Sequence, residues 1–169
     1  ENEFLPFLYP NQYVNFSPDS EASKLALSMV SEDTSDIDAL KQIYNYVVNN
    51  LSYDYDKAET VETGYLPDVD ETLSTKTGIC FDYAALTTAM LRSCDIPCKL
   101  QIGYTGDIKH AWIDVYIRSK GWVTNAVSFN GDSWSLMDPT FDSSADSDDS
   151  EAIQDYIGNA DNYTVQFTR

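Results

Sequence analysis

Three residues of this 169-residue chain have side chains that could together form an activated nucleophile: Cys80, His110 and Asp138. A thiolate is a strong nucleophile, and an imidazole can exchange a proton near neutral pH. A carboxylate can hold that imidazole in one tautomer and stabilise its charged form. Because the chain contains a single histidine, any imidazole base must be His110. The residue types therefore predict a cysteine nucleophile activated by a neighbouring base.

Cys80 follows Gly78 and is predicted to open a helix that runs to about Ser93. The first turn of a helix presents several backbone N–H groups and about half a positive charge, which favour a thiolate over a thiol. The same N–H groups could later bind an oxyanion. Gly78 is interpreted as the residue that lets the backbone turn tightly before the helix. Taken alone, a cysteine here is more typical of a small buried residue, and that interpretation stays open.

His110 opens a predicted strand, from which its ring could reach a helix N-terminus packed across the sheet. Asp138 ends another predicted strand, which Pro139 stops. Asn125 and Asp114 are alternative groups for orienting the imidazole. Each residue also fits an ordinary structural role when it is considered by itself, because Asp-Pro turns and strand-capping histidines are common.

The elements that must position these residues follow from periodicity and turn signals. Residues 1–18 are predicted to form an extended N-terminal arm, and residues 52–75 a long ordered loop. Helices followed by an antiparallel meander predict an α+β fold, in one domain over residues 1–169 with a core at about 34–141. The arm should pack Phe4, Leu5, Phe7 and Leu8 on the body. Helices are predicted at 22–31, 35–51, 80–93 and 151–157, and strands at 99–104, 111–117, 122–129, 133–137 and 163–167.

Composition excludes several classes of function. The formal charge of −18 argues against a nucleic-acid partner and against an anionic membrane surface. The chain lacks both an apolar run of membrane-spanning length and the CxxC or second histidine that a Cys/His zinc site needs. Three cysteines exclude a fully paired disulfide framework. Because the chain starts at Glu1, we expect a processed protein that is extracellular or on the cell surface, with a cytoplasmic location as the alternative.

Taken together, the motifs resemble the transglutaminase-like superfamily, in its bacterial type, whose fold is a permuted relative of papain-like cysteine proteases. The resemblance runs from about Ala39 to Phe141. The segments that carry it, in order, are VVNNLSYD at 47–54, TGICFDYA at 77–84, LRSCDIPCK at 91–99, Gly103-Tyr104, HAWIDVY at 110–116 and WSLMDPT at 134–140.

The resemblance implies a role for each site residue. Cys80 would be the nucleophile, His110 the base and acid, and Asp138 the orienting carboxylate. The stretch 118–132 is longer than in many members, so we expect an extra hairpin there; Asn125 would substitute if Asp138 did not return beside His110. Gly78 and Trp112 would line the cleft, although Trp112 could equally fill the core. Candidate oxyanion donors are the Cys80 backbone and the side chains of Tyr53, Tyr55 and Tyr65.

The implied activity is acyl transfer on a protein or peptide carboxamide through a thioester, with water or an amine as acceptor. A lysine-bearing acceptor would suit the acidic surface. No cofactor or metal is expected; calcium at the acidic run 142–151 is a weaker alternative, because its spacing matches no EF-hand loop. The rival class is a non-catalytic protein- or glycan-binding module of a surface protein that keeps the fold.

Overall fold

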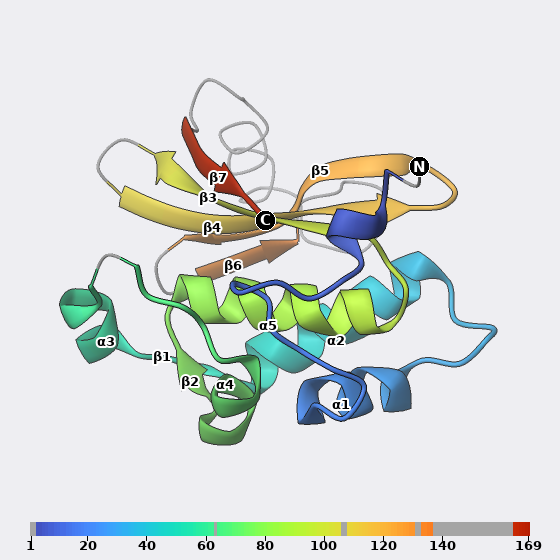
Figure 1. Ribbon diagram of the computed structural model, residues 1–169, viewed down its shortest axis with the longest axis horizontal. Coiled ribbons are helices and arrows are strands. Elements are labelled where there is room, and N and C mark those ends of the chain that lie inside the picture. Colours follow the sequence, from blue (N-terminus) through green and yellow to red (C-terminus); the bar gives the residue numbers. More distant parts are fainter. Residues whose placement is uncertain (1–2, 63, 106–107, 131–132, 137–163) are drawn as a thin grey trace, which may run out of the picture.

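An antiparallel sheet covered on one face by helices forms the body of the molecule (Figure 1). The computed structural model describes residues 3–62, 64–105, 108–130, 133–136 and 164–169. Helix α5 (Cys80–Ser93) packs against strands β3 (Cys98–Thr105) and β4 (Ile108–Ile117) of the sheet. It also packs against helices α1 (Glu21–Met29), α2 (Asp36–Asn50) and α4 (Val69–Thr75). The predicted α+β class is confirmed.

Two of the helices around α5 come from the first third of the chain: α1 (Glu21–Met29) and α2 (Asp36–Asn50). Helix α2 begins as predicted, because the Ser35 side chain accepts a hydrogen bond from the Asp38 N–H at 3.1 Å. Its fully buried residues lie at helical spacing on the face that packs on α5, and they are Leu40, Ile43 and Val47.

Residues 52–75 are more regular than the predicted loop, and that prediction is wrong. Aspartates cap both of the short helices in this stretch, since Asp54 accepts from the Lys57 N–H and Asp68 from the Glu71 N–H, each at 3.0 Å. The helices were missed because their capping residues, rather than apolar periodicity, mark them. The elements are strand β1 (Ser52–Tyr53), helix α3 (Tyr55–Thr60) and helix α4 (Val69–Thr75), followed by strand β2 (Thr77–Gly78).

Helix α5 is the centre of the core. Every residue from Cys80 to Arg92 is buried, because the sheet covers one side of the helix and three helices cover the others. Its small residues Ala84, Ala85 and Ala89 allow these neighbours to approach closely. The predicted bounds of this helix, Cys80 to Ser93, are confirmed.

The five-stranded sheet has the order β6-β5-β4-β3-β7, and all of its neighbouring strands are antiparallel. Strand β5 lies in the long stretch after Ile117 and pairs with β4 on one side and β6 on the other, so the extra hairpin expected there takes the form of one added strand. The helix predicted at 151–157 lies outside the described residues. The strands are β3 (Cys98–Thr105), β4 (Ile108–Ile117), β5 (Gly121–Asn130), β6 (Ser133–Leu136) and β7 (Thr164–Thr168).

The N-terminal arm packs on sheet residues as expected, and it includes a short 3-10 helix, η1 (Leu5–Phe7). The Phe4 ring lies 4.6 Å from that of Tyr116, between centroids, and the Phe7 ring lies 5.6 Å from that of Trp122. Leu5 was expected to pack on the body as well, but 41% of it is exposed. In a 3-10 turn, consecutive side chains point in different directions, so Leu5 cannot share the buried side of Phe4.

Candidate active site

Cys80 is the first residue of α5 and is buried, with 8% of its surface exposed. The residue before it, Ile79, is the N-cap and has extended backbone geometry. A hydrocarbon side chain at this position cannot accept a hydrogen bond from the first turn, so it does not compete with a ligand or intermediate for those N–H groups. Sequence and local structure thus place the thiol at the positive end of the central helix.

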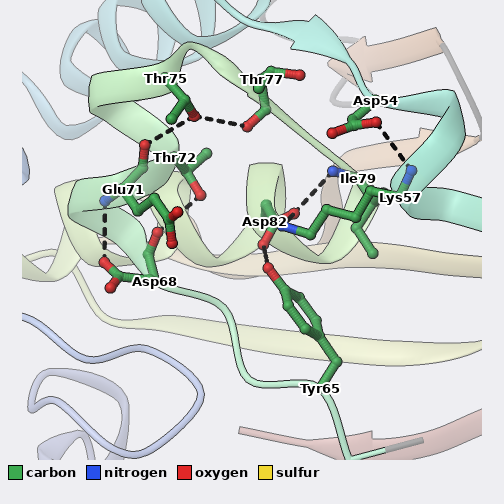
Figure 2. Close-up of polar contacts among 10 residues, drawn as sticks. All are labelled: Asp54, Lys57, Tyr65, Asp68, Glu71, Thr72, Thr75, Thr77, Ile79 and Asp82. Carbon is green, nitrogen blue, oxygen red and sulfur yellow. Dashed lines mark hydrogen bonds and ion pairs between the residues drawn. The ribbon is translucent and has the colours of Figure 1, made fainter. Parts of the chain in front are cut away.

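Asp82, which sequence analysis missed as a site residue, is fully buried next to this turn. Figure 2 shows three donors converging on its carboxylate. The Ile79 N–H and the Lys57 ammonium each lie 2.9 Å from Oδ2, and the Tyr65 hydroxyl lies 2.5 Å from Oδ1. An acidic residue at the third position of a predicted helix is a known capping signal and could have indicated the first of these bonds. The other two depend on the tertiary fold.

Gly78 is required here for a reason other than the one predicted. Its φ is not among the positive values in the described chain, so a special turn conformation does not explain it. A Cβ built on Gly78 would lie only 2.7 Å from Asp82 Cβ and 3.0 Å from its Oδ2. Glycine at this position therefore makes room for the Asp82 side chain, which folds back to reach the Ile79 N–H.

The protonation states of the groups around Asp82 suit their roles. Burial, followed by the hydrogen bond to Asp82, raises the pKa of Tyr65 to about 12, so the phenol keeps its proton and remains a donor. Burial by itself lowers the pKa of Lys57. The hydrogen bonds to Tyr65 and Asp82 and the charge of Asp82 outweigh that effect, so the net pKa shift is upward and Lys57 stays charged. Its ammonium also lies 4.5 Å from the centre of the Tyr65 ring.

The three tyrosines considered as oxyanion donors have different surroundings. Tyr53 lies on β1, whose parallel pairing with β2 sets it opposite Gly78. The Tyr55 ring packs edge-on against the Tyr53 ring at 4.9 Å, and 60% of Tyr55 is exposed. Tyr65 donates its hydroxyl proton to Asp82 and packs its ring against Phe81 at 6.2 Å. All three thus lie on the segment that adjoins the first turn of α5.

His110 and its predicted partners are only partly described. The His110 backbone lies in β4 opposite Gly103 of β3, and its side chain lies outside what the structure describes. Asp138 also lies outside the described residues. The next residue of β4, Ala111, pairs with Phe129, so Asn125 lies four positions further along β5, which corresponds to about 13 Å of strand.

Two further residues on β4 can be placed more fully. Asp114, the other alternative to Asp138, accepts a hydrogen bond from the Gln101 amide at 3.0 Å. Trp112, expected near the cleft or in the core, is 3% exposed, so it is buried. Asp114 therefore has a structural partner within the sheet, on the neighbouring strand β3.

All three cysteines are thiols rather than members of a disulfide. Burial, helped by the charge of Asp95, raises the pKa of Cys94 to about 11. Complete burial raises the pKa of Cys98 to about 12, although Arg92 acts in the opposite direction. Near neutral pH both of these residues are therefore protonated and poorly nucleophilic.

Comparison with known proteins decides the family. A family model described as the transglutaminase-like superfamily matches residues 23–139, which is more than half of the chain. The chain belongs to this superfamily. Membership supports a thiol-dependent enzyme in general terms.

Individual relatives are distant, and each is matched over part of its length. A UPF0252 protein of Methanocaldococcus jannaschii is 40% identical over 62 residues, which cover 34% of this chain and 18% of that protein. Kyphoscoliosis peptidase of Mus musculus is 24% identical over 136 residues, covering 73% of this chain and 18% of the peptidase. This chain therefore spans less than a fifth of either relative.

A solved structure shows the same fold. The crystal structure of a candidate cysteine protease from Cytophaga hutchinsonii superposes with a TM-score of 0.57 at 20% identity, over 85% of this chain and 50% of that one. At this identity the likeness shows that the two chains share a fold.

In the part of the chain that the structure describes, no three His, Cys, Asp or Glu side chains gather into a group that could hold a metal ion. The acidic run 142–151, which carried the calcium alternative, lies outside that part. None of the helices described has both the length and the apolar character needed to cross a membrane.

Proposed function

We propose that this chain is a cysteine-dependent acyltransferase or hydrolase acting on carboxamide or peptide groups of proteins. The observation that carries the proposal is the position of Cys80, at the first residue of a central helix with an apolar N-cap, in a member of the transglutaminase-like superfamily. The packing of α5 against β4, the strand of His110, supports a Cys80–His110 pair.

The proposed reaction has two halves. His110 takes the proton of the Cys80 thiol, sulfur attacks the carbonyl carbon, and the C–N bond breaks as His110 returns the proton to the leaving amine or ammonia. This leaves a thioester on Cys80. An acceptor then gives a proton to His110 and attacks the thioester carbonyl carbon, and the C–S bond breaks as the sulfur regains a proton from His110. Water as the acceptor gives hydrolysis, whereas a lysine amine gives a cross-link. Asp138 orients His110, and its place in the family motif favours it over Asn125, whose backbone lies well along β5 from the partner of Ala111.

The oxyanion of the tetrahedral intermediate would bind at the first turn of α5. Backbone N–H groups there, including that of Cys80, are suitable donors because they are fixed before the reaction begins. A second donor would come from the preceding segment. The Tyr65 hydroxyl is committed to Asp82, which counts against it, and Tyr53 is set beside the turn by its pairing opposite Gly78, with Tyr55 as the alternative.

The experiment that tests this function is product analysis by mass spectrometry after incubation with a glutamine-containing peptide and a primary amine. Amide formation with the amine, conversion of glutamine to glutamate, and peptide-bond cleavage have different product masses, so one reaction distinguishes the possible acceptors. We expect Cys80→Ala to lower the rate by at least about a thousandfold while the circular dichroism spectrum is unchanged.

Cys94→Ala is the matched control, because it removes a half-buried thiol at the far end of the same helix and should keep most of the activity. Equal product formation by the Cys80→Ala variant and the unmodified protein would contradict the proposal. A folded wild-type protein that forms no thioester with any of these substrates would favour the non-catalytic binding module.

A further inference from the structure

The cluster of Lys57, Asp82 and Tyr65 joins two parts of the site that are separate in sequence. Lys57 lies on α3 and Tyr65 follows that helix, whereas Asp82 belongs to the first turn of α5, two residues after Cys80. Both oxygens of the carboxylate are used, one by Tyr65 and the other by Lys57 and the Ile79 N–H. The cluster therefore fixes Lys57 of α3 and Tyr65 against the turn that carries the proposed nucleophile (Figure 2).

Helix capping alone does not explain the arrangement. An acidic residue at this position of a helix can reach back to the N-cap N–H while its carboxylate remains in water, as capping residues on surface helices do. Here the carboxylate is fully buried, and burying a charge is unfavourable unless it is paired and hydrogen-bonded. Lys57 supplies the opposite charge, although a third of its own side chain stays exposed.

The position of this pair has an electrostatic consequence for Cys80. An uncompensated carboxylate two residues away would repel the negative charge of a thiolate and oppose the effect of the helix N-terminus. The Lys57 ammonium, 2.9 Å from Oδ2, offsets that carboxylate. The phenols around the turn include Tyr13, Tyr53, Tyr55, Tyr65 and Tyr83, and phenols are neutral near pH 7.

We infer that Lys57 is a positioning residue that acts through Asp82: by neutralising the buried carboxylate, it allows Asp82 to shape the first turn of α5 without suppressing the Cys80 thiolate. This inference rests on the proposed function, in which Cys80 is the nucleophile. It assigns to α3 a part in preparing the nucleophile, in addition to its place at the edge of the site.

A set of charge-removing variants tests the inference through the pH dependence of Cys80 alkylation by iodoacetamide, followed by mass mapping. Lys57→Met leaves Asp82 uncompensated and should raise the pH of half-maximal labelling by roughly one unit. Asp82→Asn leaves Lys57 uncompensated and should lower that midpoint. The double variant removes both charges and should return the midpoint close to the wild-type value, while Lys57→Arg should preserve it. His110 is the same in every variant.

Lys24→Met is the matched control, since Lys24 makes an exposed ion pair with Glu21 on α1, outside the Lys57–Asp82–Tyr65 cluster. Its midpoint should equal that of the wild type. If Lys57→Met does not fold, the comparison of Asp82→Asn with the double variant still carries the test. A purely structural role would lower thermal stability in all the cluster variants without shifts of opposite sign.

Unchanged midpoints in Lys57→Met and Asp82→Asn would overturn the inference, as would a double variant that keeps the full shift of Lys57→Met. The proposed function is judged separately, by acyl transfer in the wild type and its loss in Cys80→Ala. Shifted midpoints of Cys80 labelling without acyl transfer would contradict the proposed function alone. Acyl transfer with unshifted midpoints would contradict the inferred role of Lys57 alone.

Discussion

Gly78, Cys80 and Asp82 occupy every second position along the chain, and the packing of one constrains the others. Asp82 reaches back to the Ile79 N–H, and its Cβ and Oδ2 occupy the space where a side chain on Gly78 would lie. Cys80 lies between these two residues and takes its backbone geometry from both. At the scale of single residues, the spacing of glycine, cysteine and aspartate is therefore a packing requirement as well as a chemical one.

Gly78→Ala should distort this turn. The added methyl group would come within 2.7 Å of Asp82 Cβ, so the turn must shift, and we expect a loss of about 1–3 kcal/mol in the free energy of unfolding. Urea denaturation would measure that loss, and alkylation of Cys80 should slow in the folded variant. Gly121→Ala is the control: it has φ +87 and nothing within 4 Å, so it should cost stability without changing Cys80 labelling. Unaltered stability and labelling in Gly78→Ala would contradict the packing requirement.

At the scale of elements, α5 joins the proposed nucleophile at one end to the start of the sheet at the other. The hydrogen bonds that close its C-terminus include those from the Asp95 N–H to the Arg92 carbonyl and from the Ile96 N–H to the Leu91 carbonyl, both at 3.1 Å. Asp95 has φ +59, a left-handed conformation that usually favours glycine. The buried Arg92 side chain then bonds the Cys98 carbonyl, where β3 begins.

Asp95→Gly should therefore stabilise the protein. Glycine adopts positive φ without steric strain, and we expect a gain of about 0.5–1 kcal/mol in the free energy of unfolding, reduced by the greater flexibility of glycine in the unfolded chain. Chemical denaturation measures the gain. Lys76→Gly is a matched variant, because Lys76 ends α4 at φ +57. A loss of stability in both variants would show that side-chain contacts outweigh backbone strain at these helix ends.

The elements also show where prediction from sequence succeeds. Long helices were predicted well: Ser35 caps α2 as its sequence indicates, and α5 has the predicted bounds, because local signals mark both. The short helices of residues 52–75 were missed, since a few residues give too little periodicity to recognise. The Tyr65–Asp82 bond joins residues 17 apart that meet only through the fold, so no local pattern could reveal it.

At the scale of the whole molecule, the formal charge of the chain is −18. The proposed site would have to stabilise one more negative charge, that of the Cys80 thiolate. A strongly acidic protein opposes such a charge weakly and over a long range, and salt screens this effect. The helix N-terminus must therefore supply the local stabilisation, while the charge of Asp82 is offset by Lys57. The same acidic field would attract lysine-bearing partners, which fits an amine acceptor in the proposed reaction.

The most direct test of the central claim is mass-mapped alkylation by iodoacetamide across pH, in the wild type and in His110→Ala. Labelling near neutral pH should be confined to Cys80, because burial raises the pKa of Cys94 to about 11 and that of Cys98 to about 12, so both remain thiols. We expect His110→Ala to slow Cys80 labelling by at least about tenfold, since the imidazole is the proposed base. Slow labelling that is equal at the three cysteines and indifferent to His110 would contradict an activated Cys80–His110 pair.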